Sequence, residues 1–194
     1  MKNMYVISGC NGAGKTTAAY HILPEVLQCK EFVNADEIAR GLSPFQADKA
    51  MYQAGKLMSV RINNLIEKGE SFAVETTLSA ITYREKIKHA QQNNYFVTLM
   101  YLWLTTPNLA IERVRLRVEE GGHNVTIPVI TRRYYQGIKN FFEIFMPLCD
   151  NVMLFDNSDS SQKLVMAKTK GENPEIYNEK IFNQIYQSYV KARS

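Results

Sequence analysis

The stretch Gly9-Cys10-Asn11-Gly12-Ala13-Gly14-Lys15-Thr16 decides how the rest of the chain is organised. It fits the phosphate-loop pattern of a glycine, four free positions and then Gly-Lys-Ser/Thr. Residues 4–8 before it are typical of a short buried strand, and residues 16–27 after it carry good helix formers. A glycine-rich turn that binds nothing would not need this strand-loop-helix context. The stretch therefore predicts a site for a nucleoside triphosphate.

The residue types of the loop suit a ligand with several phosphates. Gly9, Gly12 and Gly14 allow the backbone to turn sharply and to point its N–H groups inward, at the positive end of the following helix. Lys15 is expected to reach the outer phosphates, and the Thr16 hydroxyl to ligate a magnesium ion that bridges them. The predicted nucleotide-binding residues are consecutive: Gly9, Cys10, Asn11, Gly12, Ala13, Gly14, Lys15, Thr16 and Thr17.

The composition is that of an ordinary globular protein, with 45% hydrophobic and 22% charged residues. A length of 194 residues is enough for one sizeable α/β domain, and we expect residues 1–194 to form a single domain. The net charge of +4 suits an anionic substrate, but no dense run of lysine and arginine with interleaved aromatic residues is present. Nucleic acid is therefore not expected as a partner.

The three cysteines, Cys10, Cys29 and Cys149, are odd in number and widely spaced, which disfavours a disulfide framework or a zinc site. The longest apolar run, residues 95–104, is too short to span a membrane and predicts a buried strand. The chain enters its first predicted strand at once, so no signal peptide is expected. These features predict a cytoplasmic protein without a membrane association.

Along the chain, apolar runs alternate with helical patterns. Further strands are predicted at residues 31–34, 71–75, 95–104 and 151–155, and residues 163–167 are a candidate for one more short strand. Helices are predicted at residues 43–68, 83–93, 107–120 and 128–145, with a closing helix that begins at Pro174. This alternation indicates a parallel sheet covered on both faces by helices.

Two carboxylates follow the ends of predicted strands, where ligands of parallel α/β sheets lie. Asp36 is a candidate to accept the proton of a substrate hydroxyl or to hold magnesium through water; the compatible alternative is that it caps the following helix. Glu75 is a candidate to bind substrate hydroxyls or the water shell of magnesium, and the alternative is a structural carboxylate. The hydroxyl of Thr76 is expected to add a substrate contact.

A second informative stretch begins on the helix predicted at residues 107–120. Arg113 and Arg117 are four residues apart, so both lie on one helix face, and a glycine pair at residues 121–122 follows. A pair of guanidinium groups before a glycine hinge suits a lid, at about residues 113–133, that closes over phosphates. The alternative is a solvated face whose arginines pair with nearby glutamates.

Three more residues near this lid are candidates for the substrate site. Arg132 and Arg133 lie on the next predicted helix and carry the same guanidinium chemistry. His123 either contacts phosphate or caps the hinge.

Together these segments resemble the zeta-toxin family of P-loop kinases. The resemblance covers residues 3–158 and rests on the phosphate loop, Asn34-Ala35-Asp36, Glu75-Thr76-Thr77, the Arg113-to-Val125 stretch with its Gly-Gly-His-Asn-Val end, Arg132-Arg133-Tyr134 and Leu154-Phe155-Asp156-Asn157-Ser158. It implies an α/β P-loop NTPase of the kinase type, a three-layer fold with a five-stranded parallel sheet and a helical lid. ATP and Mg²⁺ are the implied cosubstrates, with transfer of the terminal phosphate to a hydroxyl.

The best-known members of that family phosphorylate UDP-N-acetylglucosamine and are held inactive by a small helical antitoxin. The resemblance therefore implies a nucleotide-sugar substrate and an antitoxin protein as a partner. It also implies that Asp36 is the base, that Glu75 lies in the sugar-nucleotide site and that the lid arginines touch phosphates. The family's second lid arginine has no counterpart at residues 122–124, and Arg132 and Arg133 are the candidates to replace it.

The sequence thus predicts an ATP- and Mg²⁺-dependent phosphotransferase with four catalytic residues, Lys15, Asp36, Arg113 and Arg117. Two alternatives stay open. One is a kinase for another small metabolite, and the other is a nucleotide-dependent switch or toxin-like ATP-binding protein that acts through a partner. Asp36 favours the kinase, because phosphorylation of an alcohol requires a base and a pure switch does not.

Overall fold

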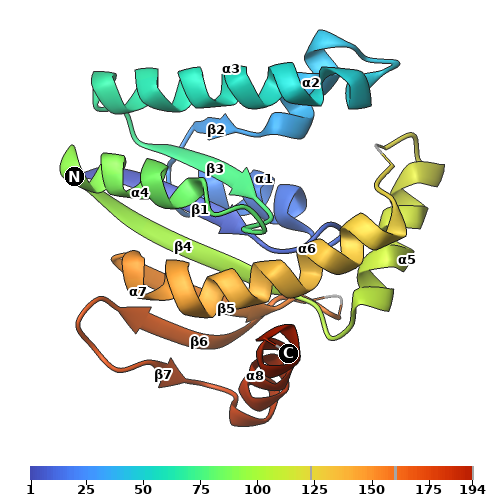
Figure 1. Cartoon of the computed structure of the whole chain (residues 1–194). Helices are drawn as coiled ribbons and strands as arrows, with labels where there is room; N and C mark the ends of the chain where they lie inside the picture. Colours follow the sequence, from blue (N-terminus) through green and yellow to red (C-terminus); the bar gives the residue numbers. More distant parts are fainter. Residues whose placement is uncertain (123, 160, 194) are drawn as a thin grey trace.

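A computed structural model describes residues 1–122, 124–159 and 161–193. These residues form a seven-stranded sheet in the order β2-β3-β1-β4-β5-β6-β7, with helices on both faces (Figure 1). The strands are β1 (Lys2–Ser8), β2 (Glu31–Val33), β3 (Phe72–Thr76), β4 (Tyr95–Trp103), β5 (Asn151–Asp156), β6 (Lys163–Thr169) and β7 (Glu175–Ile176).

The predicted parallel sheet is confirmed for five strands, β2, β3, β1, β4 and β5, which pair in parallel. The prediction of a five-stranded sheet is wrong for the sheet as a whole, because β6 and β7 extend it in antiparallel orientation. The connection between β5 and β6 is residues 157–162 and holds no helix in its described part. A connection this short can join antiparallel neighbours but cannot make a parallel crossover.

Helices cover both faces of this sheet (Figure 1). They are α1 (Lys15–Glu25), α2 (Ala35–Leu42), α3 (Ala47–Lys68), α4 (Tyr83–Gln92), α5 (Pro107–Glu119), α6 (Ile127–Asn140), a π-helical segment η1 (Phe141–Phe145), α7 (Met146–Leu148) and α8 (Glu179–Arg193). Among the described residues, no helix is both long enough and apolar enough to cross a bilayer.

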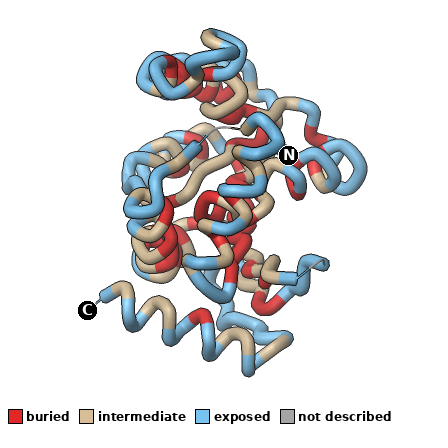
Figure 2. The backbone as a smooth tube through the Cα atoms, turned by 90° about the vertical axis from the view of Figure 1, so that its right-hand side faces the viewer, coloured by how far each residue is buried: buried red, intermediate tan, exposed pale blue. Residues whose placement is uncertain are grey.

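The alternation of side chains along β1 creates the layers. Met4 and Val6 point into the larger hydrophobic cluster, which includes residues of α3, α4 and α6. Tyr5 and Ile7 point the other way, into a smaller cluster with Leu23 of α1. Figure 2 shows that the buried residues gather at the centre of the molecule, whereas α8 is mostly half-buried or exposed.

Two predicted helix starts are wrong, and both errors have a local cause. The helix predicted from residue 43 begins at Ala47, and a separate helix, α2, precedes it. The Oδ1 atom of Asn34 caps α2, since it accepts hydrogen bonds from the backbone N–H groups of Asp36 and Glu37 at 2.8 and 3.4 Å. Asp36 is therefore not the cap, which was the alternative role for its side chain.

The closing helix begins at Glu179 and not at Pro174. Residues 175–176 pair with β6 as an edge strand, so the chain is extended just after the proline. The Oδ1 atom of Asn178 accepts a hydrogen bond from the backbone N–H of Ile181 at 3.0 Å, as an N-cap does.

Candidate active site

The phosphate loop connects the end of β1 to the start of α1, as the sequence predicts. Gly9, Gly12 and Gly14 have φ angles of +143°, +79° and +79°, which favour glycine. A Cβ atom on Gly9 would lie 2.3 Å from the carbonyl oxygen of Leu102 in β4. The glycine pattern thus serves both the shape of the loop and its close packing against the neighbouring strand.

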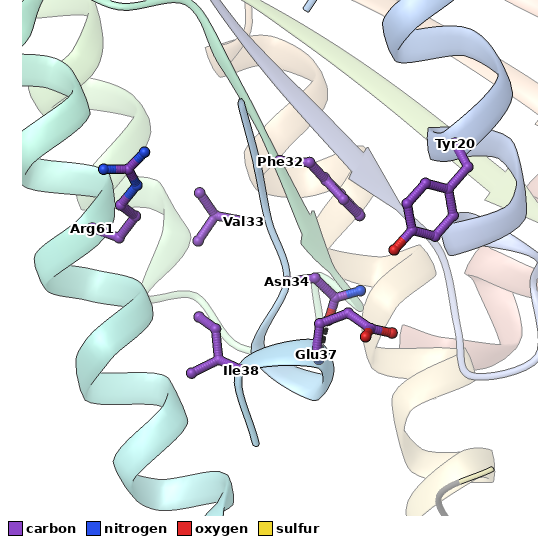
Figure 3. Close-up of a pocket in the computed structure, with 7 residues that line it drawn as sticks. All are labelled: Tyr20, Phe32, Val33, Asn34, Glu37, Ile38 and Arg61. Atoms are coloured by element: carbon purple, nitrogen blue, oxygen red, sulfur yellow. Dashed lines mark hydrogen bonds between the residues drawn. The ribbon is translucent and has the colours of Figure 1, made fainter. Parts of the chain in front are cut away.

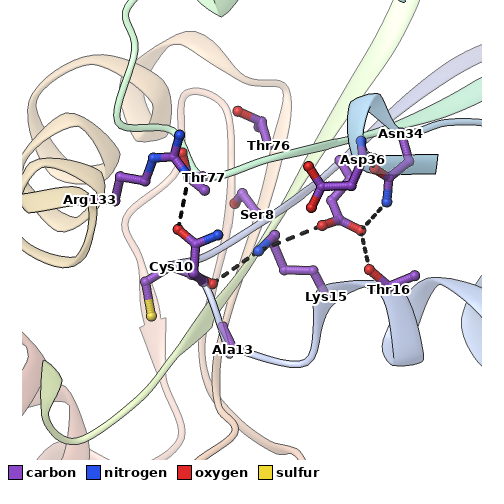
Figure 4. Close-up of polar contacts among 12 residues, drawn as sticks. Ser8, Cys10, Ala13, Lys15, Thr16, Asn34, Asp36, Thr76, Thr77 and Arg133 are labelled. Carbon is purple, nitrogen blue, oxygen red and sulfur yellow. Dashed lines mark hydrogen bonds and ion pairs between the residues drawn. The ribbon is translucent and has the colours of Figure 1, made fainter. Parts of the chain in front are cut away.

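Lys15 lies at the centre of the site, and its side chain is only 7% exposed. Its Nζ donates a hydrogen bond to the carbonyl oxygen of Cys10 at 3.0 Å (Figure 4). The same atom lies 3.6 Å from Oε1 of Glu75. A buried ammonium group requires such partners, because desolvation of an unpaired charge is costly. One backbone oxygen of the loop and one carboxylate of β3 therefore hold Lys15 in place.

Glu75, near the end of β3, joins three segments of the site. Its Oε2 atom accepts hydrogen bonds from Oγ1 of Thr16 at 2.7 Å and from Nδ2 of Asn34 at 2.9 Å. The parallel pairing of β1 with β3, which aligns Ile7 with Glu75, places the carboxylate beside the phosphate loop. The sequence analysis did not identify Asn34 as the partner of Glu75, although Asn34 directly follows the strand β2.

The residues present fit ATP and Mg²⁺. The loop offers backbone N–H groups and Lys15 for phosphates. The hydroxyl of Thr16 and the carboxylate of Glu75 are adjacent and would offer the oxygen ligands that Mg²⁺ prefers. No cluster of three or more acidic, histidine or cysteine side chains suited to a metal occurs within the described parts of the chain. Mg²⁺ does not need one, since it usually binds through one or two protein groups, phosphates and water.

The substitution Glu75→Gln is expected to lower the free energy of unfolding by about 2–3 kcal/mol, because the buried Lys15 loses its anionic partner. Excess MgADP is expected to recover part of this loss, since phosphates supply a new partner for the ammonium group. Urea denaturation with and without nucleotide measures both effects. Glu37→Gln is the matched control, because Glu37 pairs with Arg40 at the surface and its loss should cost at most about 0.5 kcal/mol. Equal losses in the two variants would contradict the role of Glu75.

Two cavities adjoin at this site. The first, here called the loop cavity, has a volume of about 350 Å³ and is lined by the phosphate loop and α5. The second, here called the acceptor cavity, has a volume of about 630 Å³ and lies between the ends of β2 and β3 and residues of α3, α4 and α6. Four residues line both cavities: Asn11, Lys15, Asp36 and Glu75.

Asp36 is half-buried in the first turn of α2, at the boundary of the two cavities. Its neighbour Glu37 faces a third cavity of about 400 Å³, which is lined by Tyr20, Phe32 and Arg61 among others (Figure 3). These two adjacent carboxylates of α2 thus line different cavities. Of these two carboxylates, Asp36 lines both the loop cavity and the acceptor cavity, and Glu37 lines neither.

The predicted arginines occupy different positions. Arg113 and Arg117 of α5 both line the loop cavity. Arg133 lines the acceptor cavity and donates a hydrogen bond to Oδ1 of Asn11 at 3.1 Å. Burial lowers the pKa of Arg133, and the nearby charge of Asp36 opposes this shift. Arg132 is exposed and lines neither cavity.

The guanidinium group of Arg113 also holds the loop that follows β5. It donates hydrogen bonds to the carbonyl oxygens of Asn157 and Ser158, both at 2.8 Å. The side chain of Asn157 in turn donates to the carbonyl oxygen of Ala13 at 2.8 Å. Sequence reasoning did not assign Asn157 to the site, because this contact spans 144 positions. Arg115, which lies between the two predicted arginines on α5, pairs instead with Glu119 at the surface.

The remaining predicted residues are placed as follows. Thr76 lines the acceptor cavity, and its hydroxyl accepts a hydrogen bond from the backbone N–H of Leu78 at 3.1 Å. Thr17 is exposed at the loop cavity. His123 lies outside the described residues. The three cysteines are buried and form no disulfide, and burial raises the pKa of the Cys10 thiol to about 11.

A phosphate loop between a central parallel strand and a helix, with a lysine and a hydroxyl directed to one site, defines the class as a P-loop NTPase. The chain belongs to the zeta toxin family, whose model matches residues 1–181. Among individual sequences, it is 27% identical over 126 residues to an uncharacterized protein of Haemophilus influenzae, covering 65% of this chain and 88% of that protein.

Solved structures show the same fold at low sequence identity. A chain of the AvrRxo1-ORF1:AvrRxo1-ORF2 complex with sulphate ions superposes with a TM-score of 0.78 at 18% identity, over 95% of this chain. This chain spans only 63% of the length of that relative. A chain of the PezAT toxin-antitoxin system of Streptococcus pneumoniae superposes with a TM-score of 0.70 at 15% identity, over 100% of this chain and 86% of that one.

Proposed function

We propose that this protein transfers the γ-phosphate of ATP, with Mg²⁺, to a hydroxyl group of a small acceptor, and that the acceptor is a nucleotide sugar such as UDP-N-acetylglucosamine. The observation that carries the proposal is the position of Asp36, which lines both the loop cavity and the acceptor cavity. A base at this boundary meets the acceptor hydroxyl on one side and the terminal phosphate on the other. The AvrRxo1 complex, a structural neighbour, has also been solved with ATP.

In the proposed reaction, Asp36 accepts the proton of the acceptor hydroxyl as its oxygen attacks the γ-phosphorus. A new O–P bond forms, the bond from the γ-phosphorus to the β–γ bridging oxygen breaks, and ADP leaves with that oxygen. Lys15 and the backbone N–H groups of the phosphate loop hold the β- and γ-phosphates. Because Lys15 lines both cavities, it stays beside the group that moves.

Three further groups support the transfer. Arg113 and Arg117 line the loop cavity, where guanidinium groups offset charge on the transferred phosphoryl group. Thr16 and Glu75 would hold Mg²⁺, which neutralises charge on the phosphate oxygens when it is bound. Thr76 and Arg133 line the acceptor cavity and are proposed to bind and orient the acceptor.

A small antitoxin protein is the proposed partner. Two observations support it: the family of this chain, and structural neighbours that come from the PezAT toxin-antitoxin system and the AvrRxo1-ORF1:AvrRxo1-ORF2 complex. The cytoplasm is the proposed location, since ATP is available there and buried free thiols suit a reducing compartment.

The function is tested by incubating the protein with labelled ATP, Mg²⁺ and a panel of acceptors that includes UDP-N-acetylglucosamine, other nucleotide sugars and free sugars. We expect phosphorylated UDP-N-acetylglucosamine, identified by mass spectrometry, and no product with Lys15→Met, which controls for contaminating kinases. Transfer only to another acceptor would reject the nucleotide sugar and retain the kinase. Clear ATP binding without transfer to any acceptor would instead indicate a nucleotide-dependent switch.

A further inference from the structure

Lys86 of α4 is a cation in the wall of the acceptor cavity that the proposed chemistry does not use. It is half-buried, and its Nζ donates a hydrogen bond to Oγ of Ser59 in α3 at 2.9 Å. Lys86 lines the acceptor cavity but not the loop cavity. Lys86 therefore lies in the part of the site that is proposed to contact the acceptor and not the nucleotide.

The two carboxylates that line the acceptor cavity with Lys86 have other partners. Glu75 is bound by Lys15, Thr16 and Asn34. Asp36, the other acid of this cavity, interacts with the charge of Arg133. In the described parts of the chain, no ion pair joins Lys86 to a carboxylate.

The electrostatic surroundings of Lys86 agree with this geometry. Burial lowers the pKa of its ammonium group, and no neighbouring acid opposes the shift. A partly desolvated cation with a single neutral partner gains more from an incoming anion than a fully solvated lysine does. The adjacent wall also carries the hydroxyl group of Thr82, which suits a phosphate or a sugar. The hydroxyls of Ser59 and Tyr83 already donate hydrogen bonds within the protein, to the carbonyl oxygens of Gly55 and Glu75.

We propose that the acceptor carries a phosphate or diphosphate group and that Lys86 binds it at the α3–α4 wall, away from the hydroxyl that reacts at Asp36. This inference rests on the proposed function, because it assumes that the acceptor cavity binds the acceptor. It concerns recognition of the acceptor and not transfer of the phosphate. Lys86 is thus a specificity-determining residue that selects phosphorylated over neutral acceptors. The simpler alternative is that its hydrogen bond to Ser59 only ties α4 to α3.

Binding of sugar probes to the MgADP-saturated protein distinguishes these possibilities, because binding can be measured without phosphoryl transfer. Calorimetry with N-acetylglucosamine 1-phosphate, UDP-N-acetylglucosamine and free N-acetylglucosamine is expected to show a preference of about tenfold or more for the two phosphorylated probes. Lys86→Met and Lys86→Gln should remove the preference, whereas Lys86→Arg should retain most of it. Ser59→Ala removes the tie between the helices and should keep the preference.

Lys88→Met is the matched control, since Lys88 lies on the same helix, pairs with Glu85 at the surface and does not line the acceptor cavity. Equal binding of phosphorylated and free sugar by the wild type, binding of neither, or an unchanged preference in Lys86→Gln would overturn the proposal. Thermal melting identifies a variant that fails to fold, and Lys86→Gln then replaces Lys86→Met. If the preference is present but no acceptor is phosphorylated, the anion site stands and the proposed kinase reaction fails.

Discussion

Asp36→Asn is expected to lower the rate of phosphoryl transfer by about 10²–10⁴-fold, the usual contribution of a positioned general base. Asparagine preserves the size of the side chain but cannot accept the proton of the attacking hydroxyl. Asn34, and not Asp36, caps α2, so the helix should keep its start. The affinity for ATP is expected to stay unchanged or to rise slightly, because a negative charge leaves the wall of the loop cavity.

Steady-state kinetics and nucleotide binding together test this prediction. The matched control is Glu37→Gln, which removes a carboxylate from the same first turn but from a side chain that faces the third cavity. Any general effect of lost charge at the start of the helix appears in both variants. Transfer at the full wild-type rate by Asp36→Asn would show that another group is the base.

Gly9→Ala is expected to destabilise the protein by about 3 kcal/mol or more and to abolish nucleotide binding. The added methyl group would lie 2.3 Å from the carbonyl oxygen of Leu102, which is held in β4 at the centre of the sheet. The φ angle of +143° adds strain for any residue with a side chain. Because β4 is paired on both sides, with β1 and β5, we expect the loop to move and to lose its shape.

Urea denaturation of Gly9→Ala measures the loss, and Gly41→Ala in α2 is the control. A Cβ atom on Gly41 meets nothing within 4 Å, so this substitution should be neutral or stabilise the helix by about 0.5–1 kcal/mol. Wild-type stability and nucleotide affinity of Gly9→Ala would show that the loop tolerates the clash by local rearrangement.

The parts of the fold that the sequence predicted correctly depend on local patterns. The phosphate loop follows from spacing within eight residues, and the five parallel strands follow from apolar runs that alternate with helices. The edge strands were harder, because β7 contains only two residues, both exposed. Helix α2 was missed because it has only eight residues and Ser43-Pro44 offered a competing start signal.

The site was predictable at the level of its residue types and less so at the level of its contacts. Glu75 was identified as a strand-end carboxylate, but its pairing with Lys15 depends on the register between β1 and β3. The hydrogen bonds of Arg113 to the loop after β5 span 44 and 45 positions. Such contacts depend on tertiary structure, which no local pattern encodes. Lys86 gave no signal, since a single lysine on a polar helix is usually solvated.

The carboxylate of Glu75 has one more consequence for how nucleotide enters. Lys15 and Thr16 are already satisfied by this resident anion, so phosphates do not fill a vacant positive site but must compete with an existing counter-ion. The free energy gained on nucleotide binding is therefore the attraction of Lys15 to phosphate minus its attraction to Glu75, and not the full attraction to phosphate. In the proposed reaction, an exchange of this kind would moderate the affinity for ADP as well as for ATP, which would favour release of ADP.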